Sequence, residues 1–166
     1  YDISQTTARP RAKQPVSHDP RALLNAMIYK RPVEIRSVDE LPDHASAIYD
    51  HEQKVIFVCR GLDADNLFCG LSKAIAEAEI AFTTDEYITE NASYKAHCVS
   101  YILGKEFGFE VSDYNFGNPS DLLRTDDPQA IRAELSEIRD TAYDISARMI
   151  RSLEKEKAPR NNEQER

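Results

Sequence analysis

The stretch from Leu67 to Ala81 constrains this chain most, because its apolar residues recur with the spacing of an α-helix. They share one helical face, which comprises Leu67, Phe68, Leu71, Ile75 and Ala78. Lys73 and Glu77 fall together on a different face. A helix with such a stripe must bury it against another element, so this segment predicts a layered domain with a core.

Three short segments with strand character precede this helix, at residues 33–38, 45–50 and 54–60. The last two are separated by the polar turn from Asp50 to Gln53, which predicts a hairpin. The third segment is apolar on both faces, which predicts a central position in the sheet. We therefore expect an α+β fold with a small, mostly antiparallel three-stranded sheet packed by helices.

Three further helices are expected around the sheet. The first begins at Pro20 and ends near Lys30, because Pro32 cannot continue a helix. Another follows the connection from Thr83 to Asn91 and stops at Gly108. Its predicted inward residues are Tyr94, Cys98, Tyr101 and Ile102.

A long C-terminal helix begins after Asp127 and Pro128, which form an N-cap and first-turn pair. Its apolar residues alternate in steps of three and four, at Ile131, Leu135, Ile138, Ala142, Ile145, Met149 and Leu153. This narrow seam can close the core or pair two copies of the chain. A homodimer through the C-terminal helix therefore stays open.

Length and composition indicate one domain. A chain of 166 residues with 41% hydrophobic content can bury one sizeable core and is short for two. Residues 1–19 mix proline with basic side chains and predict a linker or arm from a missing N-terminal domain. Residues 20–157 form the predicted domain, and residues 158–166 are expected to be a disordered tail.

Cysteines and hydropathy favour a cytoplasmic protein. The three cysteines are odd in number and lack C-x-x-C spacing, so neither a disulfide framework nor a cysteine zinc site is indicated. No apolar run approaches the roughly 20 residues that span a bilayer. We expect no membrane partner.

The predicted central helix has the frame of a zinc-peptidase helix with different polar residues. The motif H-E-x-x-H places two histidine ligands on one face and a catalytic glutamate beside them. Here the corresponding segment reads K-A-I-A-E, with Lys73, Ala74 and Glu77 at the functional positions. Alanine cannot act as a general base, and a charged lysine offers a metal no lone pair.

The order of elements resembles the ArdC-like and LtrC-like proteins of bacterial mobile elements. The opening Tyr1 to Thr6, the K-A-I-A-E helix and the segment from Tyr94 to Tyr101 carry this resemblance. It implies a zincin-like fold over residues 20–157 and a role in antirestriction or element transfer. It also places the second-helix glutamate ligand of the family at His97.

The resemblance and the residues together predict a catalytically inactive domain that acts by binding, without a metal or other cofactor. Lys73, Glu77 and His97 are expected to form a polar cluster in place of the metal site, with Glu77 and His97 as weak metal candidates. The alternative for the same residues is a solvated Lys73–Glu77 pair and an ordinary helix histidine. The other histidines, His18, His44 and His51, are explained by solvent exposure.

Two other functions stay open. One is an active zinc-dependent peptidase with an atypical site built on Glu77 and His97. The other is a DNA-associated or DNA-mimic module, because residues 1–38 hold seven basic and three acidic side chains, whereas residues 39–90 hold three basic and twelve acidic. The hypothesis of an inactive binding domain implies a protein partner, and DNA could bind through a missing N-terminal domain.

Overall fold

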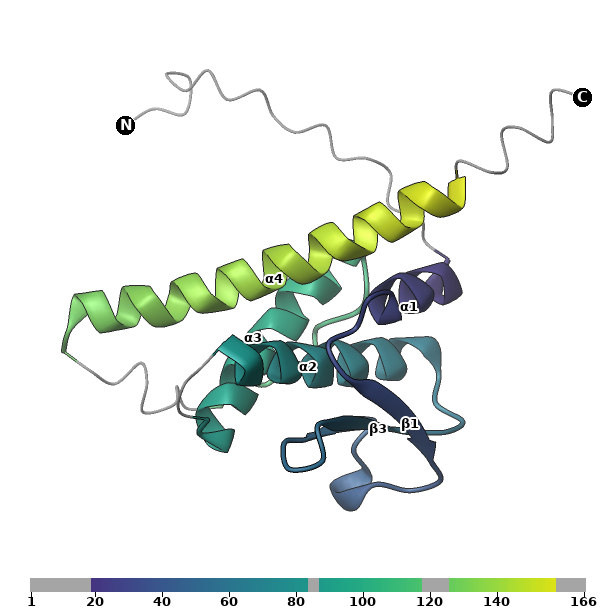
Figure 1. Ribbon diagram of the computed structural model, residues 1–166, viewed down its shortest axis with the longest axis horizontal. Helices are drawn as coiled ribbons and strands as arrows, with labels where there is room; N and C mark the ends of the chain where they lie inside the picture. Colours follow the sequence, from purple (N-terminus) through teal and green to yellow (C-terminus); the bar gives the residue numbers. More distant parts are fainter. Residues whose placement is uncertain (1–18, 84–86, 118–125, 158–166) are drawn as a thin grey trace, which may run out of the picture.

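The computed structural model describes residues 19–83, 87–117 and 126–157, so the segment Tyr1 to Thr6 and the predicted tail lie outside the described residues. Figure 1 shows a small sheet at one side, a helical layer over it, and the long last helix crossing the opposite side. The elements are α1 (Pro20–Ile28), β1 (Glu34–Val38), a short 3₁₀ turn η2 (Pro42–His44), β2 (Ala47–Asp50), β3 (Val55–Cys59), α2 (Ala64–Thr83), α3 (Thr89–Phe107) and α4 (Pro128–Lys157). The α+β prediction and the long C-terminal helix are confirmed.

The sheet has the order β1-β3-β2, so the third predicted strand is central, as expected. β2 and β3 form the predicted antiparallel hairpin. β1, however, pairs with β3 in parallel, with Glu34 opposite Val55 and Val38 opposite Cys59. The prediction of a mostly antiparallel sheet is therefore wrong, and the sheet is mixed. The reason is geometric: two chain reversals make β1 and β3 run in the same direction, and β3 lies between the other strands.

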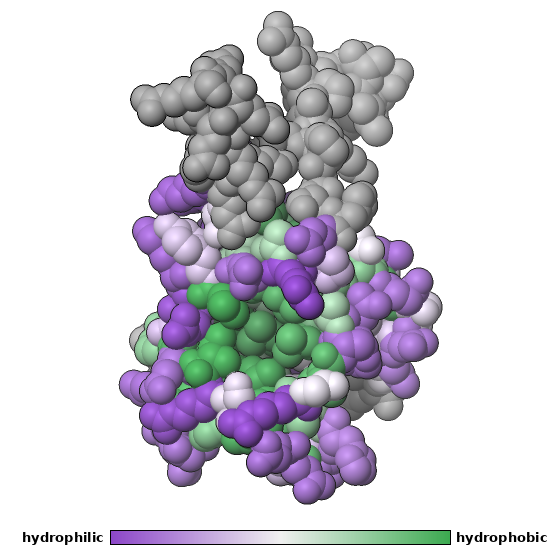
Figure 2. All heavy atoms as spheres, turned by 90° about the vertical axis from the view of Figure 1, so that its right-hand side faces the viewer, coloured by the Kyte–Doolittle hydropathy of each residue, from purple (hydrophilic) through white to green (hydrophobic). Residues whose placement is uncertain are grey.

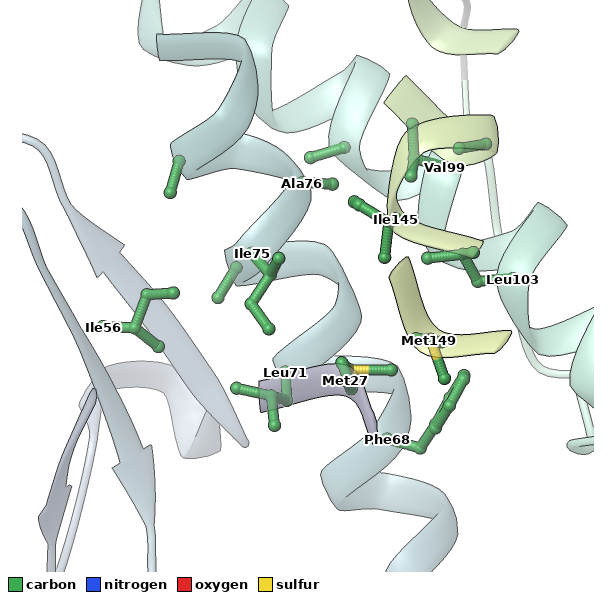
Figure 3. Close-up of a cluster of buried hydrophobic side chains, with 14 of the residues drawn as sticks. Met27, Ile56, Phe68, Leu71, Ile75, Ala76, Val99, Leu103, Ile145 and Met149 are labelled. Atoms are coloured by element: carbon green, nitrogen blue, oxygen red, sulfur yellow. The ribbon is translucent and has the colours of Figure 1, made fainter. Parts of the chain in front are cut away.

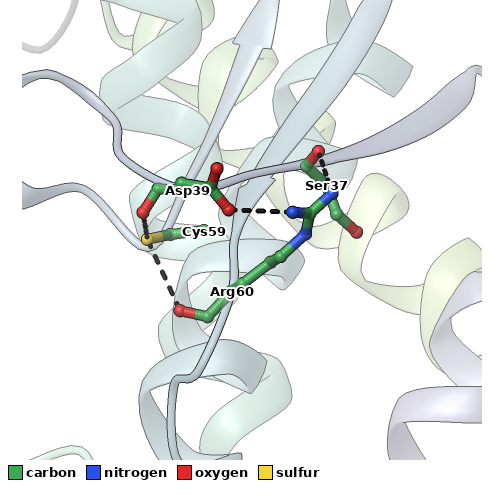
Figure 4. Close-up of polar contacts among 4 residues, drawn as sticks. All are labelled: Ser37, Asp39, Cys59 and Arg60. Carbon is green, nitrogen blue, oxygen red and sulfur yellow. Dashed lines mark hydrogen bonds and ion pairs between the residues drawn. The ribbon is translucent and has the colours of Figure 1, made fainter.

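Polar contacts join the ends of the parallel strands (Figure 4). Arg60 donates to the Asp39 carboxylate at 2.8 Å and to the Ser37 carbonyl at 3.4 Å. The Cys59 thiol lies 3.3 Å from the Asp39 carbonyl. Because the Arg60–Asp39 ion pair is exposed, it contributes little to the stability of the fold.

Helix ends follow the sequence signals. Asp19 caps α1 by accepting from the backbone N–H of Arg21 at 3.1 Å, and Asp63 accepts from Asn66 at 2.9 Å at the start of α2. α3 ends at Phe107 because Gly108 adopts a left-handed conformation with φ of 80°. The predicted stops near Lys30 and at Gly108 agree with the observed ends of α1 and α3 within two residues.

The predicted inward face of α3 is wrong by about one residue. Ile102 is exposed, and Tyr94, Cys98 and Tyr101 are only half-buried. The buried positions are Ala92, Lys95, Ala96, Val99, Ser100, Leu103, Gly104 and Phe107. The face is shifted because Lys95 and Ser100 are buried polar residues with partners, which an apolar pattern does not reveal.

α2 lies at the centre of one hydrophobic core (Figure 3). Ile75 and Leu71 lie near Ile56 of the sheet, while Ala76 and Phe68 lie nearer Val99 of α3 and Met149 of α4. The buried part of the α4 seam consists of Ile138, Ala142, Ile145, Met149 and Leu153. This seam therefore closes the core of its own chain along most of its length.

Figure 2 shows the side of the molecule that lies at the right of Figure 1. Hydrophobic residues gather there in a hollowed patch that is ringed by hydrophilic residues. Among the described helices, none combines the length and apolar character needed to cross a membrane.

Candidate functional site

The residues predicted to replace a metal site come from two helices that pack along each other. Lys73 and Glu77 lie on α2, and His97 lies on α3. Ala74, the position of the catalytic glutamate in the resemblance, is 2% exposed and belongs to the hydrophobic core. The polar cluster thus borders the core without extending into position 74.

Glu77 is a buried carboxylate, 8% exposed, whose partner is an aromatic hydroxyl. Tyr87, just before α3, donates to Glu77 Oε1 at 2.9 Å. Burial raises the pKa of Glu77, and the Tyr87 hydrogen bond and the charge of Lys73 offset only part of that shift. Burial and the neighbouring carboxylate also raise the pKa of Tyr87, so this hydroxyl remains a donor at neutral pH.

His97 lies among aromatic side chains of the segment that follows α3. Its ring centroid is 4.9 Å from that of Tyr114 and 5.1 Å from that of Phe116. Burial lowers the pKa of His97, the charge of Lys73 lowers it further, and a hydrogen bond with the Asn115 backbone opposes both. Its Nε2 atom is buried without a hydrogen-bond partner among the described residues.

Lys73 connects these two groups through its charge alone. Its positive charge lowers the pKa values of both Glu77 and His97. No ion pair within 4.0 Å joins it to Glu77 in the part of the chain that the structure describes. The structure therefore brings the three side chains into electrostatic range without bonding any two of them together.

These residues do not fit a tetrahedral zinc site. Zinc needs three or four nitrogen, sulfur or oxygen ligands, and only Glu77 and His97 among the predicted positions can supply one. Within residues 19–83, 87–117 and 126–157, no three or more His, Cys, Asp or Glu residues are grouped so that they could hold a metal ion.

A second cluster near Glu77 was not predicted from the sequence. The exposed His51, at the hairpin tip, stacks on Tyr87 with a centroid separation of 4.0 Å and an interplanar angle of 3°. Beside them is a groove of about 610 Å³, lined by Leu41, Pro42, Ile48, Tyr49, Asp50, His51, Glu52, Phe57, Tyr87 and Thr89. Tyr87 therefore links the buried Glu77 carboxylate to this surface groove.

A buried hydroxyl network holds the other side of the site together. Ser72 of α2 and Ser100 of α3 have their hydroxyl oxygens 2.6 Å apart, and each lies within hydrogen-bond distance of the Cys69 carbonyl, at 3.1 Å and 3.0 Å. The Tyr114 hydroxyl lies 2.6 Å from that of Ser100. This network fixes Tyr114, which in turn packs against His97.

The sequence signals for the missed residues are weak. Tyr87 lies in a segment predicted as a connection, and serines at core positions carry no apolar periodicity. His51 was correctly expected to be exposed, but its stacking depends on the approach of two segments distant in sequence.

Comparisons with protein-family models, with curated proteins and with solved structures give no match. The zincin-like assignment accordingly has no support from these comparisons, and the family assignment depends on the resemblance in sequence alone.

Proposed function

We propose that this chain is a catalytically inactive, metallopeptidase-like domain of the ArdC-like and LtrC-like kind, which acts by binding in antirestriction or element transfer. The observation that carries the proposal is the burial of Ala74 in the core, at the position where the family places its general base. A methyl group in a packed core can neither take a proton nor contact a substrate.

Lys73 supports the same proposal. Its positive charge lowers the pKa values of Glu77 and His97, and it disfavours a second cation near them. An ammonium offers a metal no lone pair and has none of the Lewis acidity that hydrolysis needs.

A binding role also agrees with two surface features. The hollowed apolar patch ringed by hydrophilic residues in Figure 2 is typical of surfaces that contact another protein. The groove beside Tyr87 combines apolar walls with a few polar groups, which is common at binding sites. A protein is therefore the partner that we expect.

Metal content and hydrolysis test the absence of catalysis. The purified full chain is dialysed, its zinc is measured by elemental analysis, and its cleavage of an unstructured protein substrate is followed. We expect zinc well below one per chain and the same negligible cleavage for the parent and for Glu77→Ala. Near-stoichiometric zinc that disappears in His97→Ala, together with cleavage that disappears in Glu77→Ala, would overturn the proposal in favour of an active peptidase.

The biological role needs a separate measurement. Expression of the chain in a bacterial host with an active restriction system should raise the transformation efficiency of unmodified plasmid DNA. Because the proposed action is binding, Glu77→Ala should protect as well as the parent. Protection by the parent that Glu77→Ala abolishes would point to chemistry at this site instead.

A further inference from the structure

A second cavity lies where the last turns of α4 pass over the end of α1 (Figure 1). Its volume is about 320 Å³, and six residues line it: Tyr29, Lys30, Arg148, Arg151, Glu154 and Lys155. We call it the α1–α4 cavity. It is separate from the groove at the hairpin, with which it shares no lining residue.

The lining of the α1–α4 cavity is strongly cationic. Four lysine and arginine side chains face one carboxylate, Glu154, in a chain whose formal net charge is −8. A cluster of positive charges that lines a cavity attracts a negatively charged ligand and repels cations, even in a protein that is acidic overall.

Arg148 is the most informative member of the lining. Its Nη1 donates to Glu79 of α2 at 2.7 Å, which holds the guanidinium in place. Its Nε and Nη2 atoms are buried and have no hydrogen-bond partner among the described residues. A buried guanidinium with two free donors costs free energy unless a ligand or water accepts from them.

Tyr29 and Lys155 belong to the same lining and contact each other. Lys155 donates to the Tyr29 hydroxyl at 3.0 Å, and its ammonium lies 5.4 Å from the Tyr29 ring centroid. The ammonium of Lys30 lies 5.8 Å from the same centroid. Because two cations already lie near this ring, the cavity favours an oxyanion over a stacked base.

Helix dipoles explain only part of this arrangement. Lys155 lies in the last turn of α4 and complements the negative end of that helix, whereas α1 has no basic residue in its last turn. Arg148, however, lies nine residues before the end of α4, beyond the last turn where the dipole acts. The helix dipole therefore does not account for the position of Arg148.

We propose that the α1–α4 cavity binds the phosphate group of a nucleotide or of a nucleic-acid backbone. Guanidinium and ammonium groups bind phosphate oxygens through charge-assisted hydrogen bonds. Because Nε and Nη2 of Arg148 are closed to solvent, this residue would add its positive charge to the cavity rather than bond the phosphate directly. Arg151 and Lys155, both exposed, would neutralise its charge.

The experiment measures binding by the full chain and by three folded variants at about 20 mM salt, where phosphate contacts are strongest. The probes are inorganic phosphate, thymidine monophosphate and a fluorescein-labelled oligothymidylate. Arg151→Gln and Lys155→Gln remove exposed cavity cations. Arg132→Gln removes an exposed cation near the other end of α4 and is the matched control.

We expect each cavity variant to weaken binding about fivefold. The number of counterions released on binding, measured from the salt dependence, should fall by about one, whereas Arg132→Gln changes neither quantity.

Thermal stabilisation by phosphate or by the mononucleotide would identify a free-anion site. Binding of the oligothymidylate that excess mononucleotide does not displace would identify a backbone site. The proposal is overturned if no probe binds at low salt, or if the cavity variants and Arg132→Gln weaken binding equally, as expected for attraction by residues elsewhere.

Discussion

Two residues of the candidate site titrate with opposite consequences for stability. Burial raises the pKa of Glu77, so its protonated form is favoured in the folded state. That contribution is present at acidic pH and is lost as the pH rises through the folded-state pKa. The pKa of His97 is lowered, so its contribution is present at higher pH and is lost as the pH falls below the ordinary histidine value. The two contributions to the free energy of unfolding therefore change in opposite directions with pH.

Glu77→Gln should stabilise the protein at neutral pH, because the amide keeps an acceptor for Tyr87 and needs no buried charge. We expect a gain of about 1 kcal/mol in the free energy of unfolding at pH 7.5 and none at pH 4. Urea unfolding at both pH values measures this. Glu106→Gln removes an exposed carboxylate from α3 as a control, and a loss of stability in Glu77→Gln at pH 7.5 would show that the Glu77 charge is favourable.

At the scale of elements, α3 and α4 are joined by a buried ammonium. The Lys95 side chain is 7% exposed and lies 2.6 Å from Glu134 and 2.5 Å from Glu137. Burial alone would lower the pKa of Lys95, but hydrogen bonds to the two carboxylates raise it. The resulting stabilisation is complete below the ordinary lysine pKa and is lost as the pH rises through the folded-state value. These contacts hold the first half of α4, where Leu135 is 52% exposed.

Lys95→Met should therefore destabilise the chain by about 2 kcal/mol, less than for a fully buried pair because both glutamates keep some access to water. The midpoint of urea unfolding should fall while its slope stays the same. Lys105→Met, on an exposed position of the same helix, should change the midpoint little. Equal midpoints for the two variants would contradict a structural role for the α3–α4 link.

Gly70 lies where α2 packs closely against the start of β2. A Cβ atom at this position would lie 2.5 Å from the Cβ of Ser46 and 3.1 Å from the Ala47 nitrogen. Gly70→Ala should thus cost about 2 kcal/mol, although alanine is the better helix former. Gly104→Ala, where the new atom meets only the Val111 side chain, should cost less, and thermal unfolding of both variants checks the order.

The elements that could be predicted are those whose signals are local. Asp63, Gly108 and the apolar stripe of α2 specify helix ends and a buried face within a few residues. The partner strand of β1, the inward face of α3 and the Glu77–Tyr87 contact all depend on segments distant in sequence. Lys95 is an example, because its burial depends on two glutamates of another helix. These glutamates lie about 40 residues away in the sequence, so the residues around Lys95 do not indicate its burial.

At the scale of the whole molecule, the α4 seam is used within the chain. Ile138, Ala142, Ile145 and Met149 pack into the core, whereas Tyr143 is 59% exposed on another face. A dimer through the same seam would require α4 to leave its own domain, which exposes a large apolar area to water.

We therefore expect a monomer, and light scattering of the full chain at micromolar concentration should give a mass near 18.9 kDa. Leu135→Ser, at an exposed position of α4, should leave that mass unchanged. Twice this mass, reduced by Leu135→Ser, would instead show that the exposed start of α4 forms an interface.

The burial of Ala74 opposes any change of the central helix toward H-E-x-x-H. A glutamate at this position would have to bury its carboxylate where a methyl group now contacts the core, and no cation is bonded there to compensate it. Replacing Lys73 and Glu77 by histidine would restore two ligands but not the base between them. Folding thus opposes the base itself, whatever residues occupy the two ligand positions.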